Sequence, residues 1–195
     1  DEGGNGIDYV LDIEKILFND FEIDTASINY LNESDSLSYL ASNLDLIDNF
    51  GLKTLVATNH YYNFGELEGR SLDTFDEWSY LASHEDLITA FGSDTTAATK
   101  HYVANGYAEG RIKDSFDEWG YLASNNDLMK TFGTNTTEAV KHYISYGMTE
   151  GRGTNGFNAE SYLNNYADLN SNFGNDQDLA KRHYVEHGFS EGRVF

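Results

Sequence analysis

The chain has 195 residues and carries 33 acidic against 12 basic side chains, which gives a formal net charge of −21. This charge excludes nucleic acid as a partner, because nucleic acids bind basic surfaces. The chain has no Cys, which excludes disulfides, thiolate metal sites and a Cys nucleophile. It has no run of about 18 apolar residues, so we expect no membrane insertion. No signal peptide is visible at Asp1, so we expect this residue to lie inside a longer protein or at a processed start.

A glycine-rich segment stands near the start of the chain. Residues 3–11 fit the nonapeptide G-G-x-G-x-D-x-U-x. Gly4 and Gly6 allow tight turns whose carbonyls face a cation, and Asp8 adds a charged oxygen suited to calcium. Calcium needs six to eight oxygens, so an ion-free glycine loop is the alternative. The partial alternation in residues 13–24 predicts a strand.

These residues resemble the trailing edge of an RTX (repeats-in-toxin) β-roll, in which such nonapeptides bind calcium. The resemblance covers residues 1–24. It implies export by type I secretion, folding outside the cell in calcium, and an extracellular or cell-surface location.

The rest of the chain repeats itself four times with a period of 41 residues. This period is typical of a stacked repeat array. The predicted units are a β segment at 1–24 and copies at 25–70, 71–111, 112–152 and 153–195. The clearest markers are four tyrosines and four histidines in equivalent positions, which we expect to form the structural core of the repeat. They are Tyr39, Tyr80, Tyr121 and Tyr162 with His60, His101, His142 and His183.

Each copy is predicted to form three short helices. In the second copy, Thr74-Phe75-Asp76-Glu77 is a capping box that opens the first helix. Ser83, three residues before Asp86, is the expected N-cap of the second helix, and this spacing favours a capping role for Asp86 over a catalytic one. Gly92 is expected to stop that helix in a left-handed conformation.

The third helix is predicted to begin at Asp94 and to end at Gly106. Its buried stripe is Ala98, His101 and Tyr102.

One copy contains too few large apolar side chains to be stable alone, so the copies must stack on one another. The predicted fold class is therefore mainly α, a short α-solenoid behind a small N-terminal β segment. The fourth copy has Asn164 and Asn170 at positions that are apolar in the other copies, which is typical of a capping repeat. Residues 39–195 also resemble tandem repeats that stand beside RTX blocks in large secreted bacterial proteins. This resemblance implies neighbouring RTX blocks and an extracellular location, and it implies no activity.

The four histidines invite a metal or haem hypothesis. Equivalent residues of stacked copies should lie about 8–10 Å apart, too far for neighbouring imidazoles to share one zinc ion. We therefore expect structural histidines, no zinc and no haem, with calcium as the one candidate cofactor.

A Glu-Gly-Arg tripeptide follows the third helix in every copy. It predicts an ion pair that holds one copy on the next, and the alternative is a row of arginines and aromatic rings that grips a glycan or polyanion. Trp78 and Trp119 could stack on sugar, although their helical phase favours the core. The charged residues are Arg70, Arg111, Arg152 and Arg193 with Glu68, Glu109, Glu150 and Glu191.

The chain contains none of the common catalytic motifs that we sought, and we predict no enzymatic activity. The predicted function is an extracellular structural or assembly module in a surface layer, filament or adhesin stalk, with self-association or a cell-surface polysaccharide as its partner. The alternatives are a glycan- or polyanion-binding module and an accessory region of a secreted enzyme.

Overall fold

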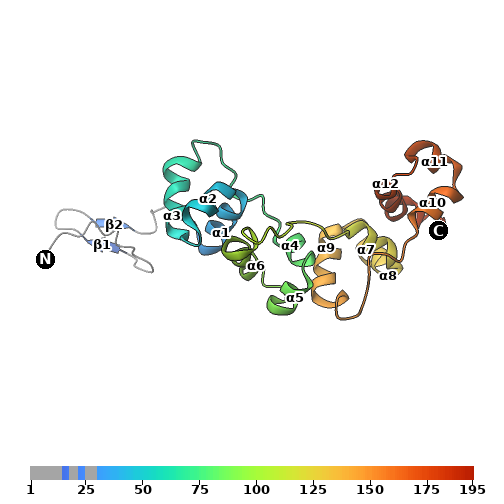
Figure 1. Ribbon diagram of the computed structural model, residues 1–195, viewed down its shortest axis with the longest axis horizontal. Coiled ribbons are helices and arrows are strands. Elements are labelled where there is room, and N and C mark those ends of the chain that lie inside the picture. The colour runs from blue at the N-terminus through green and yellow to red at the C-terminus, as the bar shows by residue number, and fades with distance from the viewer. Residues whose placement is uncertain (1–14, 18–21, 25–29) are drawn as a thin grey trace.

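The protein is mainly helical, and its helices are arranged in four similar groups along the longest axis of the molecule (Figure 1). The computed structural model describes residues 15–17, 22–24 and 30–195. Each group has three α-helices, and the third continues into a π-helical turn. The α-helices are α1 (Glu33–Ser42), α2 (Leu44–Phe50), α3 (Thr54–His60), α4 (Glu77–Ala82), α5 (Glu85–Phe91), α6 (Thr95–His101), α7 (Glu118–Ser124), α8 (Asn126–Phe132), α9 (Thr136–His142), α10 (Ala159–Asn165), α11 (Ala167–Phe173) and α12 (Gln177–His183). The π-helical turns are η2 (Tyr61–Gly65), η3 (Tyr102–Gly106), η4 (Tyr143–Gly147) and η5 (Tyr184–Gly188).

Two short strands lie in the N-terminal segment. β1 (Lys15–Leu17) and β2 (Glu22–Asp24) are antiparallel, with Ile16 opposite Ile23. The RTX nonapeptide, with the calcium candidates Gly4, Gly6 and Asp8, lies outside the described residues. The β-roll therefore stays a prediction.

In the second and third copies the first helix begins two residues later than the sequence predicted. The N-cap of α4 is Asp76, whose Oδ1 accepts a hydrogen bond from the Ser79 amide at 2.9 Å. The expected cap at Thr74 is therefore wrong. Asp76 caps the helix because its carboxylate accepts a hydrogen bond from one of the free amides of the first turn. Its negative charge also interacts favourably with the positive end of the helix dipole.

The expected N-cap of the second helix is also wrong. His84 is the residue before α5, and its side chain makes no capping bond. Ser83 instead closes α4, and its Oγ accepts a hydrogen bond from the Ser115 amide, 2.8 Å away in the segment that leads to the next copy. The same contact recurs from Thr74 to Ser42 at 2.7 Å and from Gly156 to Ser124 at 2.9 Å. Asp86 does stand in the first turn of α5.

Glycine ends the second helix, as predicted, but in a conformation more demanding than the common left-handed one. Gly92 has φ 60° and ψ −126°, and its amide bonds to the Ile88 carbonyl at 2.8 Å. A Cβ is poorly tolerated in this part of φ/ψ space, which only glycine enters readily. Gly51, Gly133 and Gly174 repeat the conformation.

The third helix ends at Gly106, as predicted, but its last turn is not α-helical. It begins after Asp94, as expected, and then widens into the π-helical turn η3, where the Tyr107 amide bonds to the Tyr102 carbonyl five residues earlier. Gly110, with φ 69°, marks the turn that follows. A single π turn inserts one extra residue into the helix, and such turns are common where a side chain or ligand needs space.

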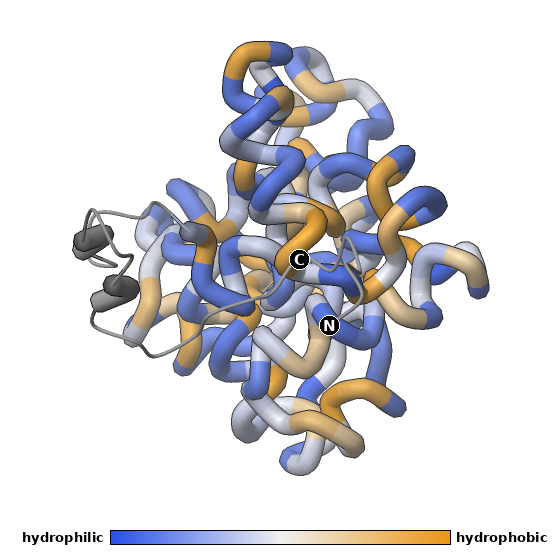
Figure 2. Tube along the Cα trace, turned by 90° about the vertical axis from the view of Figure 1, so that its left-hand side faces the viewer, coloured by the Kyte–Doolittle hydropathy of each residue, from blue (hydrophilic) through white to orange (hydrophobic). Residues whose placement is uncertain are grey.

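The core runs through all four copies. In every copy it contains the repeated tyrosine and a leucine from the first helix, a leucine from the second helix and an alanine from the third helix; the first three copies add an alanine from the first helix and a second apolar residue from the second helix. Hydrophobic and hydrophilic stretches alternate along the chain trace (Figure 2). In the part of the chain that the structure describes, no helix is long and apolar enough to cross a membrane.

Neighbouring copies contact one another by one rule. The first helix of each copy packs against the third helix and π turn of the next copy: α1 against α6 and η3, α4 against α9 and η4, and α7 against α12 and η5. Each copy therefore offers a different face to each neighbour. This repeated helix packing confirms the predicted stacked arrangement, and the surfaces that join the copies are heterologous.

Candidate functional site

The centre of each copy is a hydrogen bond between its marker tyrosine and its marker histidine. The side chain of Tyr80 is completely buried, and its hydroxyl lies 3.0 Å from His101 Nδ1. The other three tyrosines are equally buried and make the same bond at 2.9–3.0 Å, in the pairs Tyr39–His60, Tyr121–His142 and Tyr162–His183. A buried tyrosine hydroxyl needs such a partner, because an unpaired one would cost about 1–3 kcal/mol.

The π turn brings a glycine against that tyrosine hydroxyl. A Cβ on Gly106 would collide with the Tyr80 hydroxyl, and it would come within 3.2 Å of Tyr102 Cδ2. Gly65, Gly147 and Gly188 are placed in the same way against their own tyrosines. Glycine is required here for close approach, since the φ angles of these four residues are not positive.

The environment keeps both members of the pair neutral. Burial raises the pKa of Tyr80, Tyr121 and Tyr162 to about 12. Burial, and then the positive charge of Arg111, lowers the pKa of His101 below 6.5. At neutral pH the Tyr80–His101 pair is therefore an uncharged hydrogen bond inside its copy.

The arginine of the Glu-Gly-Arg tripeptide is bound inside its own copy. Arg111 Nη1 lies 2.9 Å from Asp86 Oδ2, and its Nε lies 2.7 Å from Glu109 Oε2. The predicted ion pair between copies is therefore wrong for these residues. Gly110, with its positive φ, lets the chain turn so that both carboxylates reach one guanidinium.

The other copies repeat this arrangement. Arg70 bonds to Asp45 and Glu68, Arg152 to Asp127 and Glu150, and Arg193 to Asp168 and Glu191, at 2.6–3.0 Å. The hydrogen bond from Arg70 holds the pKa of Asp45 below its usual range. Two carboxylates thus bind each guanidinium through Nε and Nη1 and balance its charge, which disfavours its use in holding a polyanion.

Each marker histidine has its Nδ1 committed to tyrosine and its ring set against a phenylalanine. The rings of His101 and Phe91 are 5.8 Å apart, and those of His142 and Phe132 are 5.7 Å apart at a steep angle. Among residues 30–195 no group of three His, Cys, Asp or Glu side chains is placed to hold a metal ion. The contacts that these histidines make are those of structural imidazoles.

The contacts between copies use other residues than the tripeptide. Trp78 on α4 is half-buried beneath Lys141, whose Nζ is 5.6 Å from the ring centroid. Trp119 on α7 lies in the same way beneath Arg182, at 5.5 Å. Both cations come from the third helix of the following copy, so the tryptophans belong to the junctions.

The first junction replaces this cation–π contact with an ion pair. Lys100 of α6 bonds to Glu33 of α1 at 3.1 Å. In the third junction Lys181 adds an ion pair to Asp117 at 2.7 Å. A basic residue on the third helix is therefore the common element of all three junctions.

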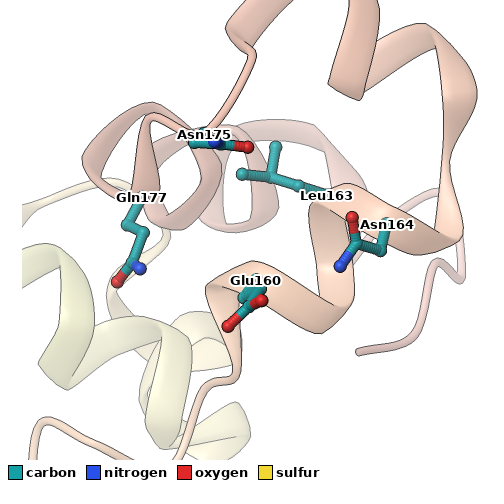
Figure 3. A pocket seen from close by; sticks show the side chains of 5 residues that line it. All are labelled: Glu160, Leu163, Asn164, Asn175 and Gln177. Carbon is teal, nitrogen blue, oxygen red and sulfur yellow. The ribbon is translucent and has the colours of Figure 1, made fainter.

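The corresponding face of α10 is polar and is not covered by another copy in the described part of the chain. It borders a pocket of about 300 Å³ lined by Glu160, Leu163, Asn164, Asn175 and Gln177 (Figure 3). Glu160 stands where the preceding copies have Trp78 and Trp119, and Asn164 stands where they have alanine. This placement favours the predicted capping role of the fourth copy, since a polar face disfavours a further copy.

Comparison of this chain with protein-family models, with curated proteins and with solved structures gives no match. The geometry of the copies and their junctions therefore carries the functional argument.

Proposed function

We propose that the chain is a structural module, a repeat-built spacer or assembly unit of a surface layer, filament or adhesin stalk. The observation that supports this proposal is the use of one head-to-tail contact at three successive junctions. Such a contact adds length in one direction for each copy, while the repeated tyrosine, histidine and arginine side chains are hydrogen-bonded inside the copies. Because every copy of such a solenoid is held in place by its neighbour, the stack keeps its two ends at a defined separation.

Removing one copy in register tests the spacer role. Deletion of residues 71–111 joins Arg70 to Ile112 and preserves the 41-residue period. A spacer should lose about a fifth of its maximum dimension in small-angle X-ray scattering. A compact globule of the same mass would shrink by only about a tenth. Shrinkage of the second kind, with the helices retained, would refute the proposal.

Assembly needs a separate measurement on the secreted protein in calcium. Electron microscopy should show layers or filaments, or labelling of the cells that secrete it. Dispersed particles with no binding to those cells would count against an assembly role and would leave the chain a spacer at most.

We also propose that the protein is secreted and that calcium acts at the N-terminal nonapeptide. The sequence Gly3-Gly4-Asn5-Gly6-Ile7-Asp8 supports this, through the resemblance described above. Calorimetric titration of the full chain with calcium, against a matched Asp8→Asn variant, provides the test. Equal heats of calcium binding for both proteins would exclude Asp8 as a calcium ligand.

A further inference from the structure

One position of the segment that follows each π turn carries a very different side chain at each of the three junctions. Every copy from the second onward stacks a phenylalanine on a tyrosine, with ring centroids 4.5–4.8 Å apart. The pairs are Phe75–Tyr102, Phe116–Tyr143 and Phe157–Tyr184. The residue next to each pair is Lys113, Thr154 and Phe195 respectively, and these three are spaced by one period.

In the first junction the space beside the aromatic pair is filled by Lys113. Its ammonium lies 5.7 Å from the centroid of Phe75 and 5.2 Å from that of Tyr102. It also donates a hydrogen bond of 3.1 Å to the carbonyl of Ala41 in the first copy. Both rings are then only 3% exposed.

In the third junction the same space is filled by an aromatic ring. The ring centroid of Phe195 lies 4.7 Å from that of Phe157 and 5.3 Å from that of Tyr184. Those two rings are 7% and 4% exposed. A side chain of this protein therefore covers the aromatic pair in both the first and the third junction.

The second junction has only Thr154 at this position, and its groove is open. The groove measures about 500 Å³, and its lining includes Phe116, Tyr143, Thr154 and Ala82, the equivalent of Ala41. Tyr143 is 8% exposed and Phe116 is more exposed than the equivalent Phe75. The groove thus contains the same aromatic and backbone groups that hold the Lys113 ammonium one copy earlier.

The charge around this open groove suits a cation. Glu85 lines it where the first junction has Leu44, and the Tyr143 hydroxyl donates to Glu85 Oε1 at 3.4 Å. Asp117 and Arg152 also line it, but Asp117 is bonded to Lys181, and Arg152 to Asp127 and Glu150. Glu85 therefore supplies a carboxylate that has no cationic partner among the described residues.

We propose that this groove binds a primary alkylammonium group from outside the chain, in the place that Lys113 takes in the preceding junction. The ring faces attract the cation, the Ala82 carbonyl accepts its hydrogen bond, and Glu85 balances its charge. The alkyl stem lies along the rings, as lysine stems do on apolar surfaces. A free diamine and a lysine side chain of another protein both carry this group.

The probe is pentane-1,5-diamine, titrated into the full chain with ¹³C-labelled Phe and Tyr rings. We expect saturable shifts of the Phe116 and Tyr143 signals, and none with the neutral analogue pentan-1-ol. In a Thr154→Lys variant the groove is filled from within, so the affinity should fall by about tenfold or more. A Thr154→Ser variant is the matched control and should bind as the wild type does.

The converse variant opens a second groove. Lys113→Thr should make the Phe75 and Tyr102 signals respond to the diamine as well. Shifts that do not saturate, or that persist unchanged in Thr154→Lys, would indicate diffuse attraction to the acidic surface and would overturn the proposal. Titration with Nα-acetyl-lysine methylamide then distinguishes the two sources, because tighter binding of that probe favours a protein lysine and tighter binding of the diamine favours a free amine.

Discussion

The close contact between Gly106 and Tyr80 makes a sharp prediction about coupling. A Gly106→Ala side chain would meet the Tyr80 hydroxyl, which is held by His101 on its other side. Overpacking of this kind costs about 1–3 kcal/mol, and a broken hydrogen bond in a buried site costs about 1–3 kcal/mol. The better helix propensity of alanine returns about 0.5–1 kcal/mol. We expect the free energy of unfolding to fall by about 2–4 kcal/mol.

Removing the hydroxyl should relieve that collision. Tyr80→Phe alone loses the bond to His101, at a cost of about 1–3 kcal/mol. In the double variant the nearest atom of the Tyr80 ring is Cζ, 3.4 Å from the added Cβ, and only the 3.2 Å contact with Tyr102 Cδ2 remains tight. Adding Gly106→Ala to Tyr80→Phe should therefore cost no more than about 0.5 kcal/mol, against about 2–4 kcal/mol in the wild type, so the two substitutions should be coupled by about 1.5–3.5 kcal/mol.

Urea denaturation followed by circular dichroism gives the free energy of unfolding of the wild type, the two single variants and the double variant. The control is the double variant that combines Tyr80→Phe with Gly188→Ala. Gly188 lies in the fourth copy, and its added side chain would contact Tyr162 instead of Tyr80. Effects in separate copies should add within about 0.3–0.5 kcal/mol. Additive effects within the second copy would refute the proposed contact.

Three further predictions concern the second copy. Its pH dependence should include His101: because folding lowers the pKa of this side chain, its contribution to stability is present above pH 6.5 and is lost as the pH falls below that value. His101→Gln should therefore reduce the fall in melting temperature between pH 7 and pH 5.5. Burial raises the pKa of Glu77, so this side chain acts in the opposite sense, and Glu77→Gln, which removes it, is the control. Asp76→Ala should cost about 1 kcal/mol of unfolding free energy through the lost N-cap. Thr74→Ala should change stability by less than about 0.5 kcal/mol, and the reverse order would restore the original cap assignment. Arg111→Ala should lower stability by about 1 kcal/mol, less at high salt, with no loss of any signal on a glycan array; loss of a real glycan signal without loss of stability would contradict the in-copy role.

The period of the sequence was enough to predict the arrangement of the helices. Equivalent residues must occupy equivalent places in a stacked array, so Tyr80 and His101 were expected in the core. The glycine after the second helix could also be assigned, because Gly92 follows a run of helical periodicity. These features depend on local spacing, which a sequence displays directly.

The errors arise where long-range contacts decide between local options. Ser83 has the right spacing for an N-cap, yet its hydroxyl receives the amide of Ser115 from the following segment. Gly106 does end the third helix, but the reason for the glycine was missed, because a tyrosine hydroxyl from the first helix requires its missing side chain. The periodicity of α-helices contains no signal for the π turn that makes this approach.

The candidate sites show the same division. The Glu-Gly-Arg tripeptide was recognised, but its partner Asp86 lies 25 residues away and could not be assigned from spacing. The open groove was missed entirely. One signal was present in the sequence, since Lys113, Thr154 and Phe195 differ in size and charge at equivalent positions of an otherwise regular repeat.

The most direct test of the account is the state of the four tyrosine hydroxyl protons. If every copy is built around the same buried pair, proton NMR should show four slowly exchanging hydroxyl signals, each with a nuclear Overhauser effect to one histidine. The pairs should be those spaced by 21 residues, such as Tyr80 with His101. Hydroxyl protons that exchange freely with water, or histidines whose tautomers and neighbouring residues differ from copy to copy, would contradict a stack of equivalent copies.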